Sequence, residues 1–96
     1  MKDTLTQVSS KQLVELQNQL NELAKELNET YEFVRFSLTK VGEEWKDVKF
    51  EEFKTEFNST KEEILEISER FKEYANQYLP PFIEVTQKVE NLKTSI

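Results

Sequence analysis

Residues 41–50 read VGEEWKDVKF, and this stretch holds the only glycine, Gly42, and the only tryptophan, Trp45, of a 96-residue chain. Glycine adopts the left-handed conformation that closes a helix at little steric cost, so Gly42 is predicted to end a helix. Asp47 follows as a good N-cap for a second helix. A connection this short makes consecutive helices antiparallel neighbours. We therefore expect a hairpin, with the Trp45 indole folded over its end as a largely buried wedge.

The chain before this stretch carries an apolar stripe of helical spacing. Ser9 and Gln12 form a capping-box pattern, which places the start of a first helix at residue 9. From there the apolar residues keep the alternating three-four spacing of a heptad seam. We predict a helix over residues 9–41 and a turn over residues 42–47. The seam residues of this helix are Leu13, Leu16, Leu20, Leu23, Leu27, Val34, Leu38 and Val41.

The chain after the turn repeats the stripe with bulkier side chains. We predict a second helix over residues 48–79 and a C-terminal helix over residues 82–94. Leucines on the first helix are expected to face phenylalanines on the second and to fill the space between them. The seam residues of the second helix are Phe50, Phe53, Phe57, Thr60, Ile64, Ile67, Phe71, Tyr74 and Tyr78.

Two features could interrupt the second helix. Asn58, Ser59 and Thr60 are poor helix formers, but the apolar spacing keeps its phase across them, so a continuous helix is preferred over a break. Pro80 and Pro81 lack backbone donors and crowd the preceding turn. They predict a kink or break near residue 80. The fold class is therefore all-α, an antiparallel two-helix hairpin in a single domain.

The composition limits the chemistry that the chain can perform. It has no cysteine and no histidine, which excludes thiol nucleophiles, imidazole acid–base groups and nearly all zinc sites. The net charge of −6 opposes binding to nucleic acid and to anionic lipid surfaces. No apolar run approaches the length of a membrane span, and the first residues carry no signal-peptide pattern. We expect no membrane insertion, and cytoplasmic synthesis without a signal peptide.

Carboxylates are the remaining candidates for a catalytic or metal site. Four-helix di-iron sites use Glu-x-x-His pairs, which this chain cannot supply. We interpret the acidic runs as solvated helix surface. We therefore expect no enzymatic activity, no cofactor, no metal and no small-molecule substrate. The acidic runs are Glu43, Glu44 and Asp47, and Glu51, Glu52 and Glu56.

A single hairpin of this length has a thin core, so burial against a partner is expected. Tyr31, Phe33, Phe36 and Leu65 lie off the main seam, where a second hairpin could cover them. The aromatic series on the second helix is interpreted as core, with a partner-binding groove as the alternative. We expect a protein partner, in a homodimer or heterodimer that forms a four-helix bundle.

Trp45 lies in a turn between two long heptad helices, and Phe53 follows it eight residues later. With these features the chain resembles the ESAT-like WXG family of bacterial type VII secretion, over about residues 13–78. Asp47 stands where that family has glycine. The chain is more similar to the Trp-x-Asp relatives, in which Gly-x-x-Trp-x-Asp precedes the second helix, as Gly42 to Asp47 do here, and proline follows that helix.

The resemblance implies a non-enzymatic hairpin that dimerises and serves as a secretion substrate, or as a chaperone or adaptor for a larger toxin. The family's export signal, Tyr-x-x-x-Asp/Glu, is missing, because Tyr74 is followed four residues later by Tyr78, and Tyr78 by Phe82. Secretion by a leaderless type VII-like route is therefore expected to depend on a partner. One alternative is an intracellular coiled-coil structural or scaffold protein, for example from a phage or mobile element. The other is an enzyme built on carboxylates.

Overall fold

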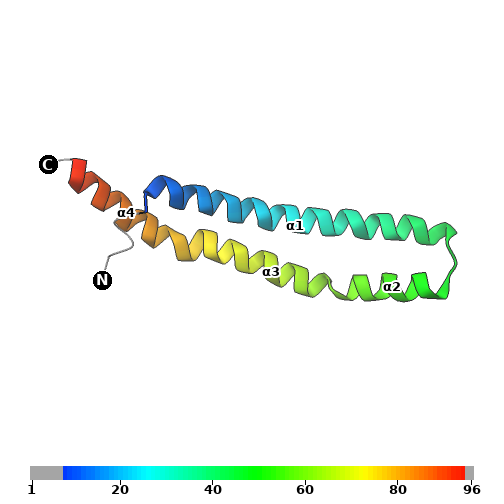
Figure 1. The fold of residues 1–96 in the computed structure, drawn as a ribbon. Coiled ribbons are helices and arrows are strands. Elements are labelled where there is room, and N and C mark those ends of the chain that lie inside the picture. Colours follow the sequence, from blue (N-terminus) through cyan, green and yellow to red (C-terminus); the bar gives the residue numbers. More distant parts are fainter. Residues whose placement is uncertain (1–7, 95–96) are drawn as a thin grey trace.

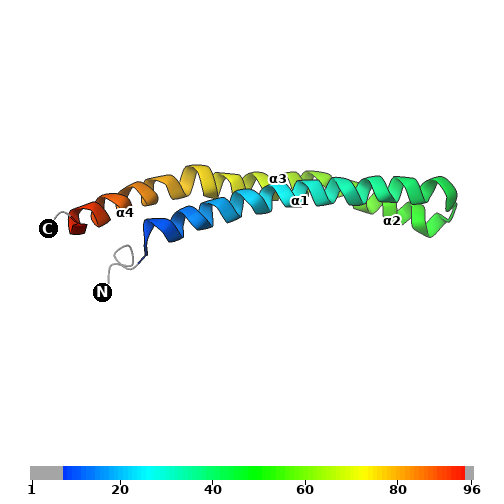
Figure 2. The same ribbon diagram turned by 90° about the horizontal axis from the view of Figure 1, so that it is seen from above.

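The computed structural model describes residues 8–94, and nearly all of them are helical. The described residues include no strand, so the predicted all-α class is confirmed. α1 runs along most of the molecule, and the chain then doubles back beside it until the end of α4 extends past the start of α1 (Figure 1). The part of the chain that doubles back, residues 48–94, is called the return leg. It crosses from one side of α1 to the other, as in a coiled coil (Figure 2). The elements are α1 (Ser10–Glu44), α2 (Val48–Ser59), α3 (Lys61–Glu73), the π-helical segment η2 (Tyr74–Tyr78) and α4 (Leu79–Thr94).

The start of α1 is capped from two directions. The Ser9 hydroxyl oxygen accepts the Gln12 amide at 3.1 Å, and the Gln12 side chain accepts the Ser9 amide at 3.0 Å, so the predicted capping box is confirmed. Ser10 donates its amide and its hydroxyl to the Glu90 carboxylate, at 2.9 and 2.6 Å. These hydrogen bonds lower the pKa of Glu90. Their stabilisation is present above the ordinary carboxyl pKa and is lost as the pH falls through the lowered value.

The predicted helix stop at Gly42 is wrong. α1 continues through Gly42 to Glu44, no described glycine has a positive φ, and the cap is Trp45, whose amide donates to the Val41 carbonyl at 2.9 Å. Gly42 is buried, and a β-carbon there would lie 3.3 Å from the Phe50 ring. The glycine therefore serves close packing between the two legs. The predicted N-cap is confirmed, since an Asp47 side-chain oxygen accepts the Lys49 amide at 3.4 Å.

The return leg breaks at Thr60, where a continuous helix was preferred. The Thr60 hydroxyl and amide both donate to the Phe57 carbonyl, at 2.6 and 3.1 Å, and the Ser59 hydroxyl donates to the Glu56 carbonyl at 2.7 Å. Side-chain hydroxyls that take backbone acceptors compete with the helical pattern. The Tyr31 hydroxyl of α1 also donates to the Phe57 carbonyl, at 2.7 Å. The regular spacing of apolar residues across Asn58–Thr60 is therefore not sufficient to keep the helix continuous.

The two prolines bend the return leg without ending it. Pro80 and Pro81 lie inside α4, in its first turn, so the predicted separate helix beginning at residue 82 is not observed. The irregularity falls one turn earlier, in η2, where the Leu79 amide donates to the Tyr74 carbonyl five residues back. A wider π turn gives the proline rings room that an α turn would deny them.

The prolines also leave a backbone acceptor for α1 to satisfy. The Ala75 carbonyl loses its α-helical donor, because the Leu79 amide bonds to Tyr74, and residue 80 has no amide proton. The Gln17 side-chain amide donates to this carbonyl at 2.8 Å. Beside it, the Asn21 and Asn76 side chains exchange two hydrogen bonds, of 3.1 and 3.0 Å. These contacts fix the register of the two legs at the π segment.

Small side chains make a fully buried contact between the legs. Ala24 and Ser68 are both fully buried, and the Ser68 hydroxyl donates to the Ala24 carbonyl at 3.0 Å. Asn28 donates to the Ser68 hydroxyl at 2.8 Å. Ala75 and Thr86 continue the buried line toward α4. We predicted that leucines of the first helix would pack against phenylalanines of the second. The centre of the contact contains small and polar side chains instead.

We predict that the cost of removing Gln17 depends on proline 80. Gln17→Ala should lower the free energy of unfolding by about 1–3 kcal/mol, because the Ala75 carbonyl is left unpaired. In a Pro80→Ala background residue 80 regains an amide proton, and the same substitution should cost clearly less. Chemical denaturation of the four variants measures the coupling. Equal costs in both backgrounds would show that the Gln17 contact does not compensate for the proline.

Candidate interaction surface

The residues predicted to form the seam differ widely in burial. Only Phe50 among them is buried. Those that are half-buried are Leu13, Leu20, Leu27, Leu38, Phe57, Thr60, Ile64 and Phe71, and those that are exposed are Leu16, Leu23, Val34, Val41, Phe53, Ile67, Tyr74 and Tyr78. Of the residues predicted to lie off the seam, Phe33, Phe36 and Leu65 are exposed, whereas Tyr31 is buried and donates to the Phe57 carbonyl.

The exposed seam residues lie on one side of the rod, because the apolar stripe of α1 is rotated out of the contact between the legs. Residues advance by about 100° along a helix. With Ala24 facing the return leg, Gln17, Asn21 and Asn28 fall on one side of the contact, and the leucine stripe falls on the other. The same construction from Ser68 places the apolar stripe of the return leg on that second side as well. The two stripes therefore lie next to each other on one surface.

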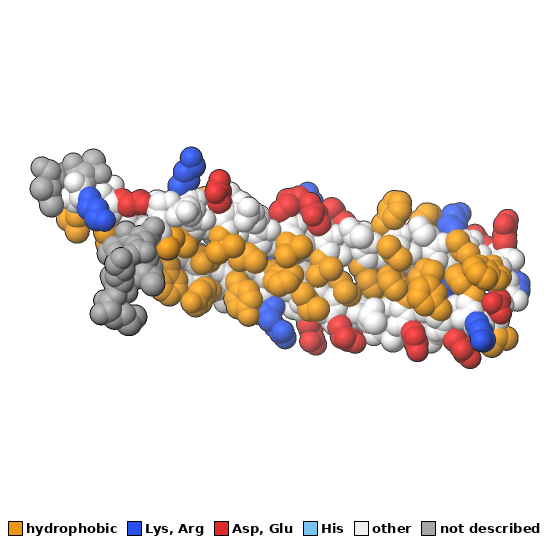
Figure 3. Space-filling view, in the orientation of Figure 1, with side chains coloured by type: hydrophobic (Ala, Val, Ile, Leu, Met, Phe, Trp, Pro, Cys, Tyr) orange, Lys and Arg blue, Asp and Glu red, His pale blue; other side chains and the backbone are white. Residues whose placement is uncertain are grey.

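We call this surface the open face, and Figure 3 shows it as a nearly continuous hydrophobic band along the rod. It has two parallel lanes of different character. The aliphatic lane lies on α1 and its exposed members are Leu16, Leu23, Val34 and Val41. The aromatic lane lies on the return leg. Its exposed members are Phe53, Ile67, Tyr74 and Tyr78, and its half-buried members are Phe57 and Phe71.

A series of stacked and tilted ring contacts supports the aromatic lane from the hairpin tip to the break at Thr60. Trp45 stacks on Phe50 with ring centroids 5.0 Å apart, and Phe50, Phe53 and Phe57 follow at 6.5 Å intervals. Tyr31 closes the column against Phe57 at 4.7 Å. Trp45 remains 54% exposed, so the expectation of a largely buried wedge is not met. Its outer ring face is available to a partner.

A second set of ring contacts, edge-on and tilted rather than stacked, lies over the π segment. Tyr74, Tyr78 and Phe82 follow one another with centroid distances of 6.5 and 5.1 Å. Tyr78 is 60% exposed. Aromatic pairs prefer offset or edge-to-face geometries, so these contacts favour a defined arrangement of the rings along the lane. Large, ordered and exposed apolar side chains are typical of binding surfaces.

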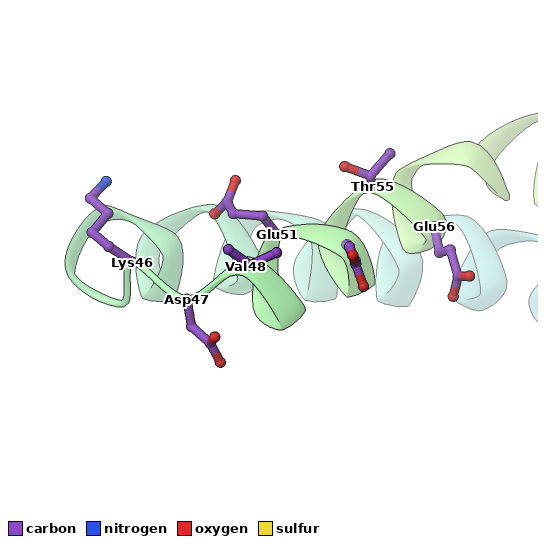
Figure 4. Close-up of a pocket in the computed structure, with 7 residues that line it drawn as sticks. Lys46, Asp47, Val48, Glu51, Thr55 and Glu56 are labelled. Carbon is purple, nitrogen blue, oxygen red and sulfur yellow. The ribbon is translucent and has the colours of Figure 1, made fainter.

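The acidic runs lie on the outside of the rod. An open depression on α2 is lined by Lys46, Asp47, Val48, Glu51, Glu52, Thr55 and Glu56 (Figure 4). Glu51 points to the opposite side from Asp47 and Glu56, so the carboxylates do not converge, and Glu51 pairs with Lys54 at 3.8 Å. Within residues 8–94, no three acidic side chains lie close enough together to hold a metal ion. On α1, Glu32 forms an ion pair with Arg35 at 2.8 Å, and the hydrogen bond from Arg35 lowers the pKa of Glu32.

Apolar spacing did not identify the polar residues that set the rotation of the two legs about their axes. Gln17, Asn21, Asn28 and Ser68 all hydrogen-bond across the contact. Their signal was present in the sequence, because residues 17, 21, 24, 28 and 31 form a stripe of helical spacing beside the leucines. That stripe carries polar or small side chains at most positions. It was outweighed by the larger apolar residues next to it.

No described helix is both long enough and apolar enough to cross a membrane. Comparison with protein-family models, with curated proteins and with solved structures found no match to this chain. The open face, with the aromatic column behind it, is the feature of the described residues that best fits a functional surface.

We predict opposite outcomes for two substitutions of Gly42. Gly42→Ala should leave the melting temperature nearly unchanged, because the gain in helix propensity of up to about 1 kcal/mol offsets the close approach to Phe50. Gly42→Val should destabilise by about 1–3 kcal/mol, since its branched side chain collides with that ring. Thermal denaturation followed by circular dichroism distinguishes them. A strong loss with alanine would instead indicate that residue 42 needs a left-handed conformation.

Proposed function

We propose that this chain is a non-enzymatic, ESAT-like helical hairpin that acts by binding a second hairpin through its open face. In this role it is a secretion substrate of a type VII-like system, or a chaperone or adaptor for a larger toxin. The observation that supports the proposal most is the open face itself. Its two lanes leave exposed large apolar side chains along both legs, from Leu16 to Val41 and from Phe53 to Tyr78.

A second hairpin is the partner that suits this surface. The face is long, narrow and made of two parallel helical stripes, which is the surface that one half of a four-helix bundle presents to the other half. Covering it would bury the leucines and aromatic rings that the single hairpin leaves half-exposed. The bundle core would then contain the residues predicted from the heptad spacing, at the interface rather than between the two legs.

The tip gives the proposal its link to secretion. Trp45 and Phe53, the pair that carries the resemblance to the WXG family, both contact Phe50 and both remain about half exposed. They are therefore placed for recognition as well as for stability. A structural or scaffold protein would use the same open face inside a bundle. The two functions differ in where the protein goes, because only the first one leaves the cell.

An export assay tests the proposal. The tagged chain is co-expressed with the genes that flank its own, in a bacterium with active type VII secretion and in a strain that lacks the membrane ATPase of that system. We expect the chain in the culture medium only when the ATPase is present. Leu23→Glu, which places a charge on the open face, should keep the protein in the cells.

Asn18→Glu is the matched control, since it adds the same charge to an exposed position of α1 away from the open face. This variant should be exported like the unaltered chain. Retention of the unaltered chain in both strains would contradict a secretion role and favour the intracellular scaffold. Normal export of Leu23→Glu would show that the open face is not needed.

A further inference from the structure

We infer that the chain has a second interaction surface, on the side of α1 that faces away from the return leg, and that this surface binds a basic segment of another protein through an apolar anchor. Phe33 and Phe36 form the surface, which we call the outer patch. The inference goes beyond the proposed function and does not depend on what the open face binds. Three observations support it, which are the position of the two rings, their exposure and the charges around them.

The outer patch lies apart from the open face. Residues advance by about 100° along a helix, so with Ala24 facing the return leg Phe33 comes to about 180°, directly opposite the contact between the legs. Phe36 comes to about 120°, on the side of Asn21 rather than of the leucine stripe. Gly42 lies about five turns after Ala24 and is buried, which agrees with this construction. A hairpin bound to the open face would therefore leave both rings uncovered.

Both rings are highly exposed. Phe33 is 73% exposed and Phe36 is 63% exposed, which is more than any exposed member of the aliphatic lane. They are three residues apart and are therefore neighbours on the helix surface. Figure 3 shows hydrophobic side chains on the upper edge of the rod, above the band of the open face. Single exposed apolar side chains are ordinary, but two adjacent phenylalanines, a residue type enriched at interfaces, indicate a binding surface.

The surroundings of Phe36 suit a basic side chain. A shallow hollow beside the ring is lined by Glu32, Arg35 and Thr39. The Lys40 ammonium group lies over the Phe36 ring, 5.6 Å from its centroid. A cation over an aromatic face is attracted by the ring quadrupole. The chain's own lysine is therefore an example of the contact that a lysine or arginine of a partner can make with the neighbouring ring.

The charges around the outer patch determine the charge of its partner. From residue 22 to its end, α1 carries six acidic side chains against three basic ones. The acidic side chains are all exposed, and they are Glu22, Glu26, Glu29, Glu32, Glu43 and Glu44. An acidic rim attracts a basic partner and guides its approach. Exposed ion pairs add little affinity, so the apolar anchor against the two rings supplies most of it.

Other kinds of partner do not match this charge. The acidic rim repels phosphate backbones and anionic lipid surfaces. A second copy of the chain is no better suited, because the outer surface of α3 is acidic too, with Glu62, Glu66, Glu69 and Glu73 around Arg70. A basic amphipathic segment of a different protein suits both the rings and the rim. The chain can then hold one protein on its open face and another on its outer patch.

Fluorine NMR tests the inference, because it observes each phenylalanine ring separately. The chain is labelled with 4-fluorophenylalanine at its seven phenylalanines, and single Phe→Leu variants assign the signals. The probe is a short blocked peptide of arginines with two central leucines, titrated at low salt. We expect the signals of Phe33 and Phe36 to shift, and those of Phe53 and Phe71 on the open face to stay in place.

Variants then measure what the two rings contribute. Phe33→Ser combined with Phe36→Ser should weaken binding of the peptide by about tenfold, since exposed aromatic side chains supply much of the affinity of an interface. The melting temperature should change little, because both rings are exposed. Val34→Ser is the matched control, since it removes an exposed apolar side chain from the same turn, on the open face. This variant should bind like the unaltered chain.

Each part of the inference can fail separately. Shifts confined to Phe53 and Phe71 would place the peptide on the open face, and no shift at any ring would show that the outer patch binds nothing of this kind. Either result would overturn the inference. A peptide with glutamates in place of the arginines should not bind, and equal binding of it would overturn the basic partner. None of these results changes the expected outcome of the export assay, whose variant Leu23→Glu alters the open face.

Discussion

The contact between Ala24 and Ser68 is the constraint on which the rest of this structure depends. Both side chains are fully buried, and the Ser68 hydroxyl bonds to the Ala24 carbonyl, so the two backbones approach closely at this point. Gln17, Asn21 and Asn28 can pair across the legs only when these small residues face each other. With the helices rotated in this way, the leucine stripe of α1 lies beside the contact between the legs rather than inside it. The open face is therefore a direct consequence of the close contact.

α1 also supports the irregular return leg through side-chain hydrogen bonds. The return leg is interrupted twice, at Thr60 and over η2, and at each place a side chain of α1 donates to the carbonyl involved. Tyr31 donates to the Phe57 carbonyl and Gln17 donates to the Ala75 carbonyl. Buried acceptors without a donor are costly, so the regular helix stabilises the irregular one where it needs support. The legs consequently stay in register despite the break and the prolines.

Much of the architecture could be predicted from the sequence, because long-range spacing and capping chemistry are local signals. The capping box at Ser9, the N-cap at Asp47 and the apolar stripes all led to the observed helices. The role of Gly42 could not be predicted, since a glycine that ends a helix and one that admits a neighbouring ring look the same in a sequence. Thr60 and η2 depend on which hydrogen bonds α1 supplies. The rotation of the two legs depends on polar residues that hydrophobic spacing does not weigh.

The central claim is that one hairpin leaves its apolar face incomplete, and thermal unfolding over a range of protein concentrations tests it most directly. If two chains complete each other, a hundredfold increase in concentration stabilises the assembly by about 2.7 kcal/mol, and the melting temperature should rise by several degrees. A hairpin that is complete by itself would melt cooperatively at one temperature at every concentration. That result would contradict the account.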